Sequence, residues 1–390
     1  MVGTTVDRRA ASGLGAAVAG MLLIAATYGM ARFGVGLFAP RIGAQRPELT
    51  DVLGWAGAAQ FTSYSLAAVL AARLVDRRPR TGLLLAGATA ITGCLGVAVA
   101  PTPALFVLAV FIGGMGGGFA SPALVPVIDA VVAPRAGAAA QSVVNSGTAV
   151  GVIGAGVVAS AAASVGAAWL FMALVCAAAT AAAWWPIRAR GDLPAAQPAA
   201  TPPAPPVRGP WRLLAVPAVA AVIAGAGSAL IWTFGPLLIT ASGAVPAERV
   251  GRLWIALGLG GVLGVLTGAL VRRSGIRGGW CWCAGALAVA GAGVGVSVAA
   301  GSAGAAYAGM ALFGAGYMGL SGVLILWARQ VWPGSAGAGT SVLFIALATG
   351  QALGSVGFGL ARDLLDPAVL AGLAAGLCAA GGLAALAGRR

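Results

Sequence analysis

The sequence predicts an all-α polytopic membrane protein, with twelve transmembrane helices in two pseudo-symmetric six-helix bundles and both chain ends in the cytoplasm. Three observations support this fold: the composition, a regular succession of apolar runs, and an internal repeat. Of the 390 residues, 60% are hydrophobic and only 8% are charged, against about 25% charged residues in an average soluble protein. The mean hydropathy is +0.97. A soluble domain with so few charges could not cover its surface, so we expect the chain to be embedded in a membrane.

Apolar runs recur along the whole chain at the length of a membrane span, which is about 20 residues. Their connections can be as short as Pro101-Thr102-Pro103, which favours helical hairpins. The ten-residue segments of alternating polarity expected of a β-barrel are absent. The first run is longer than the h-region of a signal peptide, so we interpret it as a retained helix. The predicted spans are 13–39, 52–72, 81–100, 104–128, 139–160, 166–186, 212–240, 251–271, 279–299, 304–326, 337–360 and 367–387.

The arginines indicate how the chain is oriented. All 23 basic residues are arginine, and the net charge is +14. With the N-terminus inside, 17 of them fall in cytoplasmic segments and five outside, while Arg32 lies within a span. This bias follows the positive-inside rule and predicts an inner (plasma) membrane protein with both ends in the cytoplasm. The arginines are scattered singly between apolar runs, so we expect no nucleic-acid partner.

A proline-rich segment divides the chain near its midpoint. Residues 191–210 contain seven prolines and no apolar period, which is typical of an extended linker. Short motifs recur across it: residues 72–77 resemble 268–273 at an offset of 196 residues, and 32–34 resemble 233–235 at 201. We therefore predict an N-terminal bundle (1–186), a cytoplasmic linker (187–211) and a C-terminal bundle (212–390). Transporters of this design bind substrate near the bilayer midplane, between the halves.

Arg32 is the only charge in the first apolar run. A guanidinium at membrane depth costs about 2.5–3.5 kcal/mol on insertion scales. One interpretation is a functional site that faces a polar cavity; the other is that Arg32 snorkels to the nearer interface. No Asp, Glu or His lies at the centre of any predicted span to neutralise it. Because arginine binds carboxylate and phosphate groups in a bidentate manner, this shortage of partners favours an anion site.

Several function classes are excluded by missing residues. The chain has no histidine, so zinc or haem sites built on histidine and His-based triads are ruled out. Its five cysteines lie in apolar segments, and Cys281-Trp282-Cys283 has the wrong spacing for a redox or zinc pair. A membrane enzyme would need acids, bases or metal ligands clustered at depth, so we expect no enzyme activity, no metal and no cofactor. A sensor would normally add a soluble output domain.

The loop after the second span carries a family motif. Residues 72–81 resemble the loop Gly-x-Leu-Ala-Asp-Arg-x-Gly-Arg-Arg of the major facilitator superfamily (MFS), with Leu74, Asp76, Arg77 and Arg80 matching. The resemblance extends over essentially the whole chain, because twelve spans, a central linker and a degenerate copy of the loop after the eighth span also fit. It implies that Asp76, Arg77 and Arg80 act as a cytoplasmic gate. The departures from the motif are Ala72, Pro79 and Thr81.

The resemblance also implies where substrate binds. In this family the first, fourth, seventh and tenth helices line a central cavity. Helical spacing places Tyr28 and Arg32 on one face of the first helix, and Trp232 and Tyr317 lie on the seventh and tenth. Polar side chains within other spans could contact substrate or bond to a neighbouring helix. The predicted substrate-binding residues are Arg32, Tyr28, Gln60, Asn145, Trp232 and Tyr317.

Two further likenesses bear on the transported molecule. Arg32 followed by Phe33 and Pro40 resembles the cyanate-permease-like and YbfB-like branch, which favours a small anion. Residues 145–156 resemble the glycine motif of exporters in the fifth helix, although Val152 stands where that motif has proline. We therefore predict a secondary transporter that moves a small anion by alternating access, as a monomer. The alternative is a multidrug or metabolite exporter using the aromatic cleft, and the sequence leaves coupling to protons open.

Overall fold

A computed structural model describes residues 3–74, 78–133, 136–188, 211–333 and 336–387, and this part of the chain is entirely helical outside its connections. We call residues 3–188 the N-terminal half and residues 211–387 the C-terminal half. The helices of the N-terminal half are α1 (Gly3–Ile24), η1 (Ala25–Arg32), α2 (Gly34–Gln45), η2 (Pro47–Val52), α3 (Leu53–Leu74), α4 (Pro79–Val99), α5 (Pro103–Val131), α6 (Gly137–Ala161), α7 (Val165–Trp184) and η4 (Trp185–Ile187). Those of the C-terminal half are α8 (Trp211–Ala241), η5 (Ala247–Arg249), α9 (Val250–Val262), η6 (Leu263–Leu266), α10 (Thr267–Ala300), α11 (Ala303–Val331), α12 (Ala336–Ala361) and α13 (Pro367–Ala384).

The helices follow the apolar runs of the sequence closely. Within the described residues, ten helical stretches are long and apolar enough to cross a membrane. The first of them, Gly13–Gln45, combines α1, η1 and α2, and another, Ala247–Ala300, runs for 54 residues. The structure therefore confirms an all-helical chain that passes repeatedly through a membrane.

The 54-residue stretch differs from the two separate spans predicted at 251–271 and 279–299. Its helical hydrogen bonding continues through this region, but the backbone breaks at Gly275, where φ is 72° and ψ is 170°. That conformation is open almost only to glycine, which has no Cβ to collide with the backbone. A single glycine thus makes the bend for which the sequence suggested a loop.

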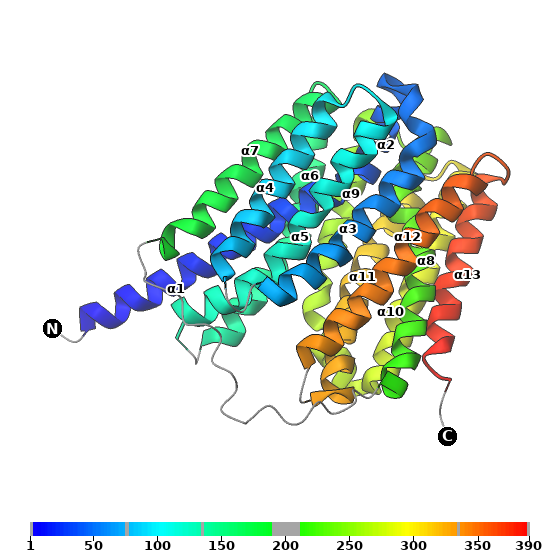
Figure 1. The fold of residues 1–390 in the computed structure, drawn as a ribbon. Helices are drawn as coiled ribbons and strands as arrows, with labels where there is room; N and C mark the ends of the chain where they lie inside the picture. Colours follow the sequence, from blue (N-terminus) through cyan, green and yellow to red (C-terminus); the bar gives the residue numbers. More distant parts are fainter. Residues whose placement is uncertain (1–2, 75–77, 134–135, 189–210, 334–335, 388–390) are drawn as a thin grey trace.

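The two ends of the helix bundle can be named by their arginines. At the Arg362 end, α2 ends, α3 and α9 begin and α12 ends; at the opposite Arg212 end, α7 ends and α8 begins (Figure 1). Between the halves, α2 packs against α8, α3 against α12, and α6 against α9. These three contacts surround the buried centre of the molecule.

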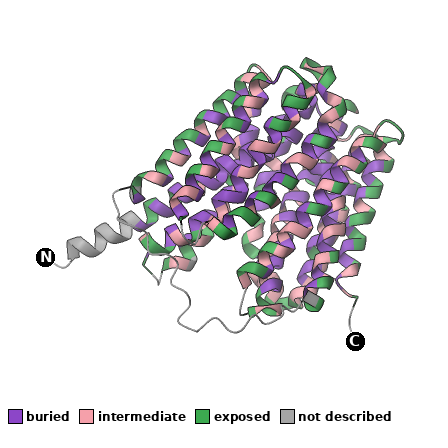
Figure 2. Cartoon of the chain, in the orientation of Figure 1, coloured by how far each residue is buried: buried purple, intermediate pink, exposed green. Residues whose placement is uncertain are grey.

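Burial follows the inner faces of the helices, both within each half and where the halves meet. Figure 2 shows buried residues along the inner faces of the helices and exposed ones on the outward faces. Many of the exposed residues are large and apolar; Leu174, for example, is 68% exposed and Val265 is 75% exposed. Such an apolar exterior suits hydrocarbon rather than water.

Candidate functional site

The first apolar stretch changes its helix type at the centre of the molecule. After α1, residues Ala25–Arg32 form the π-helix η1, and all eight of them are buried. At Phe33 the backbone leaves the helical region (φ −95°, ψ 3°), and α2 begins at Gly34. π-helical turns are rare in proteins as a whole, and those that occur are often found at functional sites. This junction presents Arg32 and Phe33 together in the core.

Arg32 is enclosed by aromatic rings and is only 2% exposed. Its Cζ atom lies 4.0 Å from the ring centre of Tyr64 and 4.6 Å from that of Tyr28. The rings of Phe33 and Phe61 lie at 4.9 and 5.3 Å. We call these four rings the Arg32 cage. A desolvated cation–π contact contributes about 2 kcal/mol, so the rings offset much of the cost of the buried charge. Arg32 therefore does not snorkel to an interface.

The rings leave the hydrogen-bonding capacity of Arg32 unused. Its Nε and Nη1 atoms are buried and have no hydrogen-bond partner among the described residues. The ion pairs found in the described part of the chain do not include Arg32 either. A buried donor without a partner costs about 1–3 kcal/mol, and more when it is charged. Arg32 thus holds donors that a ligand with acceptor oxygens can use.

A second group of rings continues the cage into the C-terminal half. Phe33 stacks on Trp232, with ring centres 3.9 Å apart and planes 15° apart. Trp232 is fully buried and meets Tyr317, Phe313 and Trp254 edge-on, at 5.1, 5.4 and 5.6 Å. The stack is a direct contact between the first and second halves of the chain, and it joins two helices that the repeat relates.

Buried polar atoms surround this ring cluster. Gln351 Nε2 donates a hydrogen bond of 3.0 Å to the hydroxyl of Tyr317, and Arg32 is close enough to Tyr317 to interact electrostatically. Gln351 Oε1, Gln60 Oε1 and Trp232 Nε1 are buried without a partner within the described residues. Proteins pair nearly all their buried polar atoms. This set of donors and acceptors therefore points to a polar ligand or to water.

Five of the six predicted binding residues lie in or beside the ring cluster. Tyr28 and Arg32 belong to the cage, and Trp232 and Tyr317 continue it. Gln60 is 1% exposed and precedes Tyr64 by four residues on α3, so both side chains lie on one helix face.

Asn145 is the exception, because the structure does not bring it to the cluster. Its side chain is exposed on α6. Its Oδ1 accepts a weak hydrogen bond of 3.4 Å from Gln141 Nε2, one turn earlier on the same helix.

The predicted gating loop is only partly visible. Asp76 and Arg77 lie outside the described residues. Arg80, on α4, donates a hydrogen bond of 2.8 Å from Nη2 to the carbonyl oxygen of Ile187 in η4. This bond joins two elements of the N-terminal half.

Several residues of the cluster are not among the predicted binding residues: Phe61, Tyr64, Trp254, Phe313 and Gln351. Tyr64 gives the closest ring contact to Arg32, and Gln351 orients Tyr317. One signal was available, since Tyr64 is one of only four tyrosines in the chain and stands one helical turn from Gln60.

The Arg362 end is closed immediately beyond the rings. The hydroxyls of Thr233 and Ser355 hydrogen-bond at 3.0 Å. A Cβ atom added at Gly57 would lie 2.8 Å from Thr233 Oγ1 and 2.9 Å from Ser355 Oγ. At Gly36 an added Cβ would collide with the carbonyl of Trp232. Small residues thus let α2 and α3 approach the C-terminal half at backbone distance.

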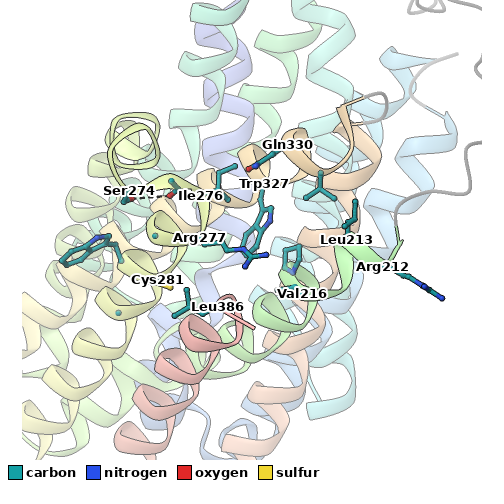
Figure 3. A pocket seen from close by; sticks show the side chains of 16 residues that line it. Arg212, Leu213, Val216, Ser274, Ile276, Arg277, Cys281, Trp327, Gln330 and Leu386 are labelled. Carbon is teal, nitrogen blue, oxygen red and sulfur yellow. Dashed lines mark hydrogen bonds between the residues drawn. The ribbon is translucent and has the colours of Figure 1, made fainter. Parts of the chain in front are cut away.

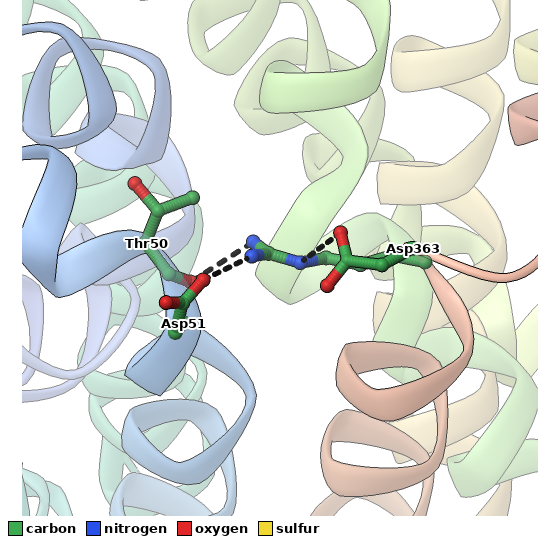
Figure 4. A network of polar contacts seen from close by, with 4 residues as sticks. Thr50, Asp51 and Asp363 are labelled. Atoms are coloured by element: carbon green, nitrogen blue, oxygen red, sulfur yellow. Dashed lines mark hydrogen bonds and ion pairs between the residues drawn. The ribbon is translucent and has the colours of Figure 1, made fainter.

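Arg362 fastens the same end by polar contacts, as Figure 4 shows. Its Nη1 donates to the carbonyl oxygen of Thr50 and its Nη2 to Asp51 Oδ1, both at 2.9 Å. A third contact, from Nε to Asp363 Oδ1, measures 3.4 Å. Arg362, which directly follows the end of α12, therefore holds the segment η2 of the other half.

Fold and site together define a polytopic α-helical membrane protein of the transporter type, with a buried charge at the contact between its halves. The family model of the Major Facilitator Superfamily matches residues 21–355, and the chain belongs to this superfamily. In a comparison with curated proteins, no sequence matches.

Solved structures share the fold at low identity. A point mutant of the nucleoside transporter NupG is 11% identical, with a TM-score of 0.76, and the match covers 97% of this chain and 100% of that one. The xylose transporter XylE from E. coli, in a partially occluded inward-open conformation, is 15% identical with a TM-score of 0.69 and coverage of 96% and 97%. A D-xylose-proton symporter is 15% identical with a TM-score of 0.73 and coverage of 96% and 95%.

Proposed function

We propose that the chain is a secondary transporter that moves a small anion across the inner membrane by alternating access. The observation that carries this proposal is the buried guanidinium of Arg32, whose Nε and Nη1 have no partner in the described residues. A carboxylate or a similar small oxyanion would accept both N–H groups in a bidentate manner. It would also neutralise the charge, which the aromatic cage alone does not do.

The proposed topology has twelve spans, with both ends and the 187–211 linker in the cytoplasm. It counts α3 as a span and divides the 54-residue stretch at the Gly275 bend. The Arg212 end is then cytoplasmic, in agreement with the excess of arginine in the segments assigned to that side. The residues 1–186 and 212–390 form the two moving bundles.

In this proposal the structure corresponds to a state closed at the Arg362 end. Substrate would reach Arg32 from the Arg212 end, passing the exposed side chain of Asn145 on α6. To open the Arg362 end, the Phe33–Trp232 stack and the contacts of Arg362 must separate. Asp76, Arg77 and Arg80 would gate the cytoplasmic side.

Two finer features stay proposals of the same kind. The sequence Arg32-Phe33 with Pro40 supports membership of the cyanate-permease-like branch. A structural neighbour is a proton symporter, which makes protons the first coupling ion to test. The protein would act as a monomer.

The experiment is a thermal-shift screen of the purified protein against small carboxylates and inorganic anions. A ligand that binds only the folded protein adds RT ln(1 + [L]/Kd) to the free energy of unfolding and thereby raises the melting temperature. We expect an anion to stabilise the native protein and to lose this effect in Arg32→Gln. Arg252→Gln is the matched control, because it removes one exposed arginine from α9.

Neutral and cationic drug-like compounds form the second arm of the screen. If such compounds stabilise the protein equally with and without Arg32, while no anion depends on Arg32, the anion proposal is wrong. Uptake of the identified anion into proteoliposomes, with and without a pH gradient, then tests transport and proton coupling.

A further inference from the structure

A large cavity opens in the C-terminal half, away from the Arg32 cage. Its volume is about 1080 Å³, and it lies at the Arg212 end between the beginning of α8, the bend of α10 and the end of α11 (Figure 3). The residues that determine its character are Arg212, Leu213, Arg277, Trp282, Trp327 and Leu386.

The charged side chains that line this cavity are basic. Arg212 and Arg277 line it, and no acidic residue of the described part of the chain does. Figure 3 shows Arg277 at the centre, beside Trp327, and Arg212 at the rim, with its guanidinium group turned outward and away from Arg277. No hydrogen bond or ion pair joins either guanidinium to another described residue. Arg272 and Arg273 are exposed nearby, on the other side of the Gly275 bend. The cavity therefore offers an anion the guanidinium group of Arg277 directly, and that of Arg212 from its rim, and neither group has a polar partner among the described residues.

The bend of α10 accounts for the position of Arg277. Gly275 turns the chain with its positive φ of 72°. Just before the bend, the hydroxyl of Ser274 donates a hydrogen bond of 2.9 Å to the carbonyl oxygen of Leu270, one helical turn earlier. The helix then restarts in a new direction, so that Arg277 lines the cavity that α8 and α11 complete.

The cavity leads onto an apolar face of α10. Trp282, at its wall, is 69% exposed, and Val289 and Val296 follow at intervals of seven residues with 61% and 56% exposed. Side chains seven residues apart lie on one side of a helix. Leu213 on α8, also in the wall, is 60% exposed. We call Trp282, Val289 and Val296 the apolar track. An exposed tryptophan near one end of a membrane-spanning helix is typical of the boundary between lipid headgroups and hydrocarbon.

We propose that this cavity binds one anionic phospholipid. Its phosphate would accept a bidentate pair of hydrogen bonds from Arg277. The exposed side chain of Arg212 would turn inward from the rim to reach the same headgroup. Its acyl chains would lie along Trp282, Val289 and Val296. A soluble phosphate would use the two arginines but not this track, so the continuity of cavity and track favours a lipid. Basic pockets between transmembrane helices are suited to such headgroups.

The test is native mass spectrometry of the full-length protein after incubation with phosphatidylglycerol or phosphatidylcholine in mixed micelles. We expect phosphatidylglycerol to bind in preference, and the double variant Arg212→Gln/Arg277→Gln to bind it at least about fivefold more weakly, since each arginine near an anionic lipid contributes about that factor. Arg252→Gln, which removes an exposed arginine at the other end, should bind like the native protein.

Three results would overturn the proposal: equal binding of both lipids, a double variant that keeps the preference, or inorganic phosphate that competes with phosphatidylglycerol at equal concentration. The last would assign the arginines to a soluble anion. If the double variant does not fold, Arg212→Gln alone is decisive, because this rim residue is exposed and its loss should still weaken the lipid preference. Neither outcome depends on Arg32, so anion transport can fail while the lipid site stands.

Discussion

At the scale of the residue, Arg32 has a positive charge that aromatic rings stabilise and N–H groups that have no hydrogen-bond partner among the described residues. Four aromatic rings within 5.3 Å replace the counter-ion that the sequence lacks at this depth. A ring face attracts the positive charge but gives the in-plane N–H groups no strong acceptor. The cage can therefore hold Arg32 when no ligand is bound and still leave its N–H groups available to an acceptor, as the proposed anion site requires. The contribution of each ring to the stability of the protein can be measured by substituting the rings one at a time.

Tyr64 is the ring to remove, because it lies closest to the guanidinium at 4.0 Å. We expect Tyr64→Leu to destabilise the native protein by about 2 kcal/mol through the lost cation–π contact, whereas Tyr64→Phe keeps the ring face and costs less. The measurement is a double-mutant cycle of thermal or chemical unfolding in detergent, repeated in Arg32→Gln. A cation–π contact requires that much of the Tyr64→Leu cost disappear in that background; an undiminished cost would mean that Tyr64 only fills space.

At the scale of the element, apolar run length predicted where helices lie but not how their backbones deviate. The π-helix at Ala25–Arg32 and the bend at Gly275 have no signal in hydropathy, since both lie within apolar or arginine-containing helical sequence. The chain has 63 glycines, so the one that adopts a positive φ within α10 could not be singled out by composition. Both deviations position arginines, Arg32 at the centre and Arg277 at the cavity.

Two glycine-to-alanine substitutions in α10 should change the free energy of unfolding in opposite directions. Gly275→Ala forces a Cβ into a conformation that only glycine adopts readily, and we expect a loss of about 1–3 kcal/mol in unfolding free energy. Gly285→Ala, ten residues later in the same helix, meets no atom within 4 Å and should gain about 0.5–1 kcal/mol from helix propensity. Denaturant unfolding in one detergent compares them. Equal effects of the two variants would contradict the observed backbone at Gly275.

The contact of α2 with α8 depends on Gly36. A side chain there collides with the carbonyl of Trp232, so we expect Gly36→Val to separate the halves at the Arg362 end. The reporter is Ser355→Cys, whose parent side chain is fully buried. Its thiol should react slowly with a maleimide in the otherwise native chain and about tenfold faster with Gly36→Val, if the contact is weakened by about 1.4 kcal/mol.

The control for this experiment is Gly376→Val on α13, where an added Cβ meets nothing within 4 Å. Labelling of the five native cysteines is subtracted by using the parent chain with Ser355 in place. An unchanged labelling rate in Gly36→Val would mean that the two helices can rearrange around the extra carbon atoms without opening.

At the scale of the whole molecule, the positions of Tyr28, Arg32, Trp232 and Tyr317 could be predicted because the family resemblance indicates which helices face the centre and helical spacing indicates which face of each. Arg32 and Trp232 lie on helices that the repeat relates, and in the structure the ring of Phe33 lies between them, over Arg32 on one side and stacked on Trp232 on the other. Residues such as Tyr64 and Gln351 could not be placed, because their role depends on which face of α3 and α12 turns toward the other half. Asn145 was placed by polarity alone, and the structure leaves it outside the cluster.

The Arg362 end stays closed because contacts between the two halves stabilise the closed state. Arg362 makes the polar contacts among them, to Thr50 and Asp51. Its acidic partners are 85% and 74% exposed, so each ion pair contributes little, about 0–1 kcal/mol. The bond from the 13% exposed guanidinium to the carbonyl of Thr50 is charge-assisted and contributes about 1.5–3 kcal/mol. Removing it should therefore favour opening by about 2 kcal/mol, which is roughly a thirtyfold shift in population.

This shift is measurable as a distance between the halves. Spin labels on Ala44→Cys of α2 and Ala247→Cys of η5, both exposed positions at the Arg362 end, would report it by double electron–electron resonance. In Arg362→Gln we expect a population at longer distance that the native chain lacks, while Arg252→Gln keeps the native distribution. Because alternating access requires this end to open, identical distributions in Arg362→Gln and the native chain would mean that apolar packing around Gly36 and Gly57, rather than Arg362, holds it closed.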